Sequence, residues 1–192
     1  MSSYTYTELQ SALGIINVIA VVKFFRAPVK STGSGYSLFV SITDPSLSGG
    51  KLQCNFFHDC KDSLPQIQAP GDVVILHRLR VREFRGQNQG YGSPAVGFAA
   101  AVFPGALTDP LEPRPSAGAC SFGEDELRRV QELREWYHSP NCPVERELPS
   151  SAAPISRDTV VADSGSTNTS GGASVLRPWN MHLHQYCSTE GQ

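Results

Sequence analysis

VVILHRLRVREFR, residues 73–85, has the composition of a long β-strand and follows a Pro-Gly-Asp turn at 70–72. In its second half, apolar residues alternate with cations and one ring. Parity along the strand places four side chains on one face: Arg78, Arg80, Arg82 and Phe84. Leu79 and Val81 point the other way. One face of this strand is therefore predicted to be cationic and to carry an aromatic ring.

Four further stretches within about 90 residues also have strand character. They are residues 15–26, 36–44, 51–58 and 95–103. Alternation in the second stretch predicts that Tyr36, Leu38, Val40 and Ile42 face inward and that Ser37, Ser41 and Thr43 face outward. In the third, Leu52, Cys54 and Phe56 face inward, and Phe57 falls among polar neighbours. With a short helical or irregular connection at 59–69 and a loop at 86–94, this order predicts an all-β fold, the five-stranded Greek-key barrel called the OB-fold.

A helix and a tail are expected after the barrel. Residues 122–138 have apolar positions at helical spacing and acids in the first turn, with Ser121 or a neighbour as the cap. After Pro140 the composition turns to Ser, Thr, Gly, Ala and Pro without periodicity. We therefore expect an α-helix that completes a folded domain over residues 1–138, followed by a disordered tail over residues 139–192.

The net charge of −2 hides an uneven distribution of charge along the chain. Residues 1–105 carry nine Lys and Arg against six acidic residues, whereas residues 106–192 carry seven against twelve. The first part therefore has a charge of +3 and the second a charge of −5. A cationic first part suits a partner that carries phosphates, although the whole chain is acidic.

Several classes of function find no support in the sequence. No run of about 18 apolar residues and no signal-peptide pattern occurs, so we expect a cytosolic or nuclear protein with no membrane partner. The five cysteines are irregularly spaced, which predicts reduced thiols. Chance explains the cluster of His182, His184 and Cys187 better than a metal site does, because it lies in a low-complexity end. Since catalytic motifs are also missing, we predict a non-enzymatic protein without cofactor or metal.

The cationic face of residues 78–84 has two interpretations. Guanidinium groups pair with phosphates and rings stack on bases, which is what single-stranded nucleic acid requires. Alternatively, the strand is charged to prevent edge pairing. Phe57 favours the first interpretation, because a large ring among polar neighbours is exposed at a cost unless a base covers it. A bulge that moves Phe57 into the core is the alternative, and Phe24, which shares parity with Arg26, has the same two interpretations.

Four runs of sequence resemble the first OB-fold domain of the protection-of-telomeres family: VVKFFRAP at 21–28, KLQCNFF at 51–57, GDVVILHRLRV at 71–81 and FRGQNQG at 84–90. The resemblance covers about residues 6–138. It implies a nuclear protein of the telomeric region of chromosomes that binds G-rich telomeric single-stranded DNA and contributes to telomere capping and length regulation. It also implies shelterin proteins as partners, although nothing after Pro140 resembles the family's second OB-fold or its partner-docking region.

The resemblance also implies a set of DNA-binding residues. In the family, bases stack on aromatic rings, and loops after the first and fourth strands hydrogen-bond base edges. Phe57 is then the principal stacking ring and Gln89 reads a base edge. The full expected set is Phe24, Arg26, Ser34, Phe57, His77, Arg78, Arg80, Phe84, Arg85 and Gln89.

Three positions depart from the family pattern. Tyr and Lys are common where Phe84 and Arg85 stand, and an acidic residue is common near Gly35. A carboxylate accepts from the amino groups of bases, so its absence near Gly35 removes one expected contact to a guanine edge. Two other functions remain open from the sequence: a general binder of single-stranded DNA or RNA, and an OB-fold module that binds a protein.

Overall fold

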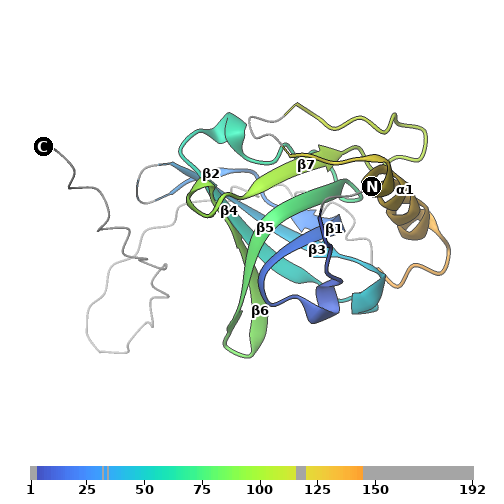
Figure 1. The fold of residues 1–192 in the computed structure, drawn as a ribbon, viewed down its shortest axis with the longest axis horizontal. Helices are drawn as coiled ribbons and strands as arrows, with labels where there is room; N and C mark the ends of the chain where they lie inside the picture. Colours follow the sequence, from blue (N-terminus) through green and yellow to red (C-terminus); the bar gives the residue numbers. More distant parts are fainter. Residues whose placement is uncertain (1–3, 32, 34, 116–119, 145–192) are drawn as a thin grey trace, which may run out of the picture. The chain divides into compact units, whose positions relative to one another are not determined.

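The computed structural model describes residues 4–31, 33, 35–115 and 120–144 of the 192 residues. Its strands are β1 (Gly14–Phe25), β2 (Val29–Lys30), β3 (Tyr36–Thr43), β4 (Leu52–His58), β5 (Val73–Phe84), β6 (Gln87–Gly92) and β7 (Ala99–Phe103). The α-helix α1 (Glu124–His138) follows them (Figure 1). Four 3₁₀ turns connect them: η1 (Leu9–Ser11), η2 (Pro45–Leu47), η3 (Lys61–Ser63) and η4 (Pro94–Val96). The tail expected at 139–192 lies outside the described residues from residue 145 onward.

Five strands close into a barrel, which confirms the predicted fold class. β1 pairs antiparallel with both β3 and β5, and β3 pairs antiparallel with β4. β4 then pairs parallel with β6, which pairs antiparallel with β5 and completes the ring. The short strand β2 adds to β3, and β7 adds to the first half of β5. Closure leaves most strand edges paired, as an OB-fold requires.

Two apolar cores lie on opposite sides of the barrel wall. The interior core includes Val40, Cys54, Phe56 and Leu79. The second core lies outside β1, β5 and β7, where Val130 and Leu133 of α1 pack on Ile75 and Phe103. The predicted apolar stripe of the helix is therefore confirmed. Its N-cap is Gly123, next-but-one to the expected Ser121, and the Gly123 N–H donates to Glu126 Oε2 over 2.9 Å.

A bulge in β5 changes the face on which its residues lie. β1 pairs Ile16 with Leu79 and Val18 with Leu76, so two residues of β5 stand opposite Asn17. Arg78 adopts a left-handed conformation there, with φ of 55°, and its N–H donates to Asn17 Oδ1 over 3.0 Å. The alternation of side chains between the two faces therefore shifts by one residue at the bulge, so that even-numbered residues before it and after it lie on opposite faces.

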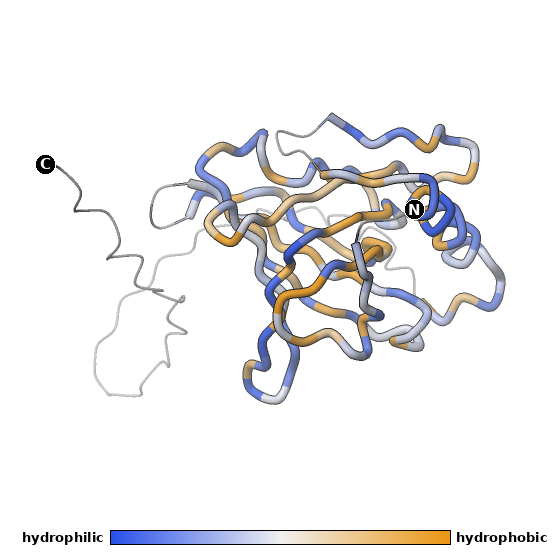
Figure 2. The backbone as a smooth tube through the Cα atoms, in the orientation of Figure 1, coloured by the Kyte–Doolittle hydropathy of each residue, from blue (hydrophilic) through white to orange (hydrophobic). Residues whose placement is uncertain are grey.

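The segment expected as a loop at 86–94 is largely a strand. β5 and β6 form a tight hairpin whose two turn residues, Arg85 and Gly86, have φ of 53° and 76°. Positive φ at both positions matches the twist of paired strands. The hairpin projects from the barrel in Figure 1 and is mostly hydrophilic in Figure 2. The strand expected at 95–103 begins only at Ala99, after η4.

Two side chains of β3 are also corrected. Ser41 and Thr43 were expected on an exposed face, but they are 1% and 0% exposed. Both lie beside β1 in the sheet, where the register pairs Phe24 with Ser41 and Val21 with Thr43. Thr43 Oγ1 is satisfied within the chain and donates to the Gly50 carbonyl over 2.8 Å.

Candidate nucleic-acid interface

Two rows of outward side chains cross four neighbouring strands, from β3 through β4 and β6 to β5. The register places Phe39, Asn55, Tyr91 and Arg80 in the first row. It places Gln53, Gln89 and Arg82 in the second, and the position that continues this row onto β3 is the buried Ser41, which is not part of the exposed surface. Neighbours across paired strands on one face lie about 5 Å apart, so each row is continuous. We call these two rows, together with Phe57, the outer face.

Glycines on the inner side of β6 keep Gln89 and Tyr91 turned outward. A Cβ on Gly90 would lie 2.6 Å from Cys54 Sγ, and one on Gly92 would lie 2.7 Å from the Phe98 ring. Such contacts are too close for any other residue, so only glycine lets β6 approach the interior this closely. The alternate side chains then belong to the outer face.

Phe57 is exposed, as predicted from its parity. The exposed fraction of Phe57 is 41%, whereas that of its neighbour Phe56 is 1%. β3 and β4 pair in unbroken register, with Phe57 opposite Ser37. A bulge that moves Phe57 into the core is therefore ruled out.

Phe24 and Arg26 meet Phe39 at the β1 side of the outer face. The rings of Phe24 and Phe39 pack edge to face, with centroids 6.4 Å apart. The Arg26 guanidinium carbon lies 5.4 Å from the centroid of Phe39. A guanidinium at this distance is attracted by the face of the ring. Two rings and one cation therefore form a cluster where β1 ends.

Cations on the second half of β5 border the opposite side of the outer face. Arg80 is half-buried and Arg82 is exposed, while Leu79 and Val81 are buried, which confirms the alternation predicted after residue 78. At the hairpin end, the Arg85 guanidinium carbon lies 5.1 Å from the centroid of Phe84. Arg82 and Arg85 thus supply positive charge from the strand to the turn.

Gln89 lies in the middle of the second row. Its Oε1 accepts from the hydroxyl of Tyr91 over 2.9 Å, so the carboxamide is oriented by the next outward residue of its own strand. The two N–H donors of the Gln89 amide take no part in this hydrogen bond. A fixed carboxamide flanked by a ring and a cation can hydrogen-bond a base edge.

A family model described as telomeric single stranded DNA binding POT1/CDC13 matches residues 1–143. The chain belongs to the POT1/CDC13 family. This agrees with the resemblance read from the sequence, and with a barrel whose rings, cations and amides share one face.

Relatives named protection of telomeres protein 1 support the family assignment. The chain is 39% identical to the Gallus gallus protein over 135 residues, which cover 69% of this chain and 17% of that protein. It is 37% identical to the Homo sapiens protein over 137 residues, which cover 70% of this chain and 21% of that protein. The chain therefore spans only about a fifth of the length of these relatives.

Solved structures of the POT1/CDC13 family share the fold. A crystal structure of a complex of Pot1 (protection of telomere) with ssDNA has a TM-score of 0.61 at 23% identity, covering 70% of this chain and 86% of that one. The crystal structure of fission yeast Pot1 and ssDNA has a TM-score of 0.60 at 21% identity, covering 70% and 48% of the two chains. At these identities, the likeness establishes the OB-fold barrel.

Arg78 does not share the outer face with the other arginines predicted to bind DNA. The bulge turns its side chain toward η4, where Nε donates to the Val96 carbonyl over 2.8 Å. Its side chain also lies against Gly97. Arg78 therefore holds the turn between β6 and β7 in place, a role that parity along β5 did not reveal.

His77 also lies apart from the outer face, since it precedes the bulge and is only 3% exposed. The ring of Tyr4 stacks on its ring with centroids 3.9 Å apart, and the Tyr6 hydroxyl lies 2.9 Å from its Nε2. Cys120 Sγ lies 3.6 Å from its Nδ1. Burial lowers the pKa of His77, although Glu126 nearby opposes this shift. His77 thus joins the N-terminal segment to the barrel, and we leave it out of the proposed interface.

The sequence-based set included one residue that is not described, and it omitted these residues of the outer face: Phe39, Gln53, Asn55, Arg82 and Tyr91. Ser34 lies outside the described residues. Arg82 had been placed on the cationic face of its strand but was not in the expected DNA-binding set. Phe39 shares parity with Ser37 and Ser41, so the signal that identified Phe57 was also present for Phe39. Tyr91 had no such signal, because its strand was expected to be a loop.

Two absences apply to the part of the chain that the structure describes. No cluster of three or more His, Cys, Asp or Glu side chains in it could hold a metal ion. None of the helices in the described ranges is long and apolar enough to cross a membrane.

Proposed function

We propose that this chain binds G-rich telomeric single-stranded DNA on the outer face, as a non-enzymatic protein of the telomeric region in the nucleus. Its role would be to contribute to telomere capping and length regulation. The observation that carries the proposal is that exposed Phe57 lies on the same barrel face as Phe39, Gln89 and Arg82. Membership in the POT1/CDC13 family and the printed names of its relatives support telomeric DNA as the ligand.

Each kind of side chain on this face suits one part of a single strand. Rings such as Phe57 stack on bases, and each stacked base contributes roughly 1–3 kcal/mol. Arg82 and Arg85 pair with backbone phosphates. The amides of Gln89 and Asn55 match the donor and acceptor groups of base edges. A duplex hides its base faces, so this arrangement favours a single strand.

The proposed binding set follows from these positions. From the sequence-based set it keeps Phe24, Arg26, Phe57, Arg80, Phe84, Arg85 and Gln89. To these the proposal adds these residues that share the outer face with Phe57: Phe39, Asn55, Tyr91 and Arg82. Docking of shelterin partners remains an expectation from the family, and no described residue is assigned to it.

A titration by fluorescence anisotropy tests the proposal. The labelled strand is a G-rich telomeric DNA of about ten nucleotides, within the site size of one OB-fold. Competitors are the same DNA without the label, the same sequence as RNA, the same sequence annealed to its complement, and oligo-dT. We expect the telomeric DNA to compete best and the duplex to compete worst. Equal competition by all three single strands would reduce the function to general single-strand binding, and strongest competition by the duplex would contradict the proposal.

A further inference from the structure

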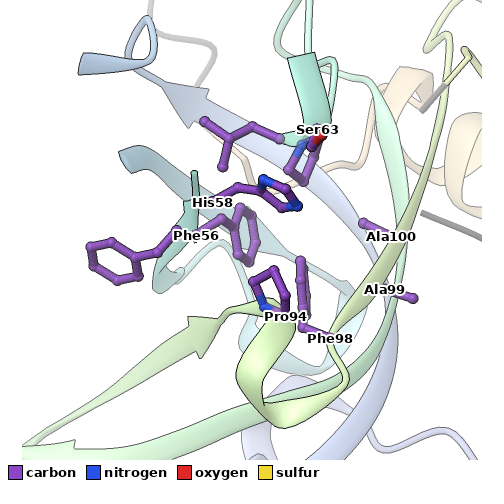
Figure 3. Close-up of a pocket in the computed structure, with 10 residues that line it drawn as sticks. Phe56, His58, Ser63, Pro94, Phe98, Ala99 and Ala100 are labelled. Carbon is purple, nitrogen blue, oxygen red and sulfur yellow. The ribbon is translucent and has the colours of Figure 1, made fainter. Parts of the chain in front are cut away.

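A cleft of about 160 Å³ opens beside Phe57, between the end of β4, η3 and the segment from η4 to β7. Figure 3 shows Phe56 and His58 on one side of it, and Pro94, Phe98, Ala99 and Ala100 around the rest. Because Phe57 both lines the cleft and belongs to the outer face, a strand bound on that face passes its opening.

The walls of the cleft are mostly apolar. The rings of Phe56 and Phe98 are stacked, with centroids 4.9 Å apart and planes 19° apart. Ala99, Leu64 and Pro65 add aliphatic surface. A flat heterocycle with a methyl group would bury apolar area here, and contact with alanine and phenylalanine is the usual way in which proteins recognise the thymine methyl group.

His58 supplies a polar group with a defined hydrogen-bonding role. The backbone N–H of Cys60 donates to His58 Nδ1 over 3.1 Å. Because Nδ1 accepts, the proton of the neutral ring lies on Nε2, which is therefore a donor. Within the described ranges, no hydrogen-bond acceptor for Nε2 is present in the protein. An acceptor on a ligand can fill that position.

We propose that this cleft takes one thymine base of the bound strand, and that His58 Nε2 donates to O4 of the thymine while the methyl group packs on the apolar wall. The inference rests on the proposed function, since it assigns one nucleotide of the strand. Thymine presents the carbonyl acceptor and the methyl group together. Cytosine presents an amino donor where thymine has O4, and this donor would face the Nε2 donor.

Base substitution at each thymine of a telomeric DNA tests the assignment on the full chain. One series replaces each thymine in turn by 5-methylcytosine, which keeps the methyl group and exchanges the O4 acceptor for an amino donor. A second series uses uracil, which keeps the acceptor and removes the methyl group. At one position, we expect each substitution to weaken binding roughly three- to tenfold, the effect of one lost contact. If no position responds to both substitutions, the assignment is wrong.

Variants of His58 connect that position to this side chain. His58→Phe keeps an aromatic ring but has no hydrogen-bond donor, so this variant should bind the thymine and 5-methylcytosine strands equally. His58→Gln keeps a hydrogen-bond donor and should still prefer the thymine strand. Asp59→Asn, at the exposed neighbouring residue, is the matched control and should behave as the parent chain. Unchanged discrimination in His58→Phe would overturn the inference while leaving the proposed function intact. If the parent chain binds no telomeric DNA, the proposed function itself fails, and the inference fails with it.

Discussion

The guanidinium of Arg26 lies over the ring of Phe39, with its central carbon 5.4 Å from the ring centroid. Arg26 follows β1, while Phe39 lies in the middle of β3, so the contact joins the loop after the first strand to the outer face. The contact lies within the chain itself, so these two side chains of the cationic and aromatic surface hold each other in position. Such preorganisation lowers the entropy cost of ordering side chains on binding.

Phe57→Ala should weaken binding of telomeric single-stranded DNA by roughly 1–3 kcal/mol, because one stacking ring is lost. The midpoint of thermal unfolding should hardly change, since Phe57 is 41% exposed. Phe56→Ala is the contrast, because its ring is buried and its loss should destabilise the fold by about 3–5 kcal/mol. Leu107→Ala, at another exposed apolar residue, should change neither property. A large loss of stability in Phe57→Ala would assign Phe57 to the core.

Binding should weaken steeply as the salt concentration rises. Each neutralised phosphate contributes a slope of about −0.7 to the plot of log K against log salt for single strands. With roughly four phosphates neutralised, the slope should be close to −3. Arg82→Ala should make the slope shallower by about 0.7, whereas Arg128→Ala removes the same charge from an exposed site on α1 and should leave it unchanged. A flat response in the parent chain would argue against phosphate contacts.

Gly90→Ala should destabilise the barrel by about 1–3 kcal/mol, as expected of overpacking. The added Cβ would lie 2.6 Å from Cys54 Sγ and 3.3 Å from both δ-carbons of Leu79. Gly33→Ala is the matched control, because a Cβ there meets no atom within 4 Å. Chemical unfolding of both variants measures the difference. Equal stability of the two would mean that β6 does not approach the barrel interior as closely as described.

The stability of the fold should decline as the pH falls below about 6.5, in part because of His77. Burial lowers the pKa of His77 in the folded chain, so the unfolded chain takes up this proton first. The contribution of His77 to the free energy of unfolding therefore decreases from about pH 6.5 down to its folded-state pKa and then levels off. His77→Phe should show a smaller decrease between about pH 8 and pH 5. His138→Phe, at an exposed histidine, should behave as the parent chain; the same behaviour in His77→Phe would remove His77 from this account.

The barrel was largely predictable from sequence because four of its strands alternate or form long apolar runs. β6 was not, since glycine, glutamine and asparagine rarely favour strands. What makes residues 87–92 a strand is the hairpin with β5, parallel pairing with β4, which lies about 30 residues earlier in the sequence, and the absence of side chains at Gly90 and Gly92. No local pattern carries that information.

The interface was predictable only where parity was unbroken. Phe57 lies on a strand in regular register, so its exposure followed directly from alternation. The bulge at Arg78 interrupts β5, and it separates His77 and Arg78 from Arg80 and Arg82. A bulge arises from tertiary pairing, here with Asn17, and leaves no clear trace in the sequence of the strand.

The position of the interface is the central claim, and a ¹H–¹⁵N NMR titration with a telomeric single strand tests it most directly. We expect the largest amide shifts at Phe39, Asn55, Phe57 and Gln89, from β3, β4 and β6, with little change along α1 (Glu124–His138). The same titration with the complementary C-rich strand should give smaller shifts at equal concentration. Shifts that concentrate on α1, or on the N-terminal segment that covers His77, would contradict the proposed binding face.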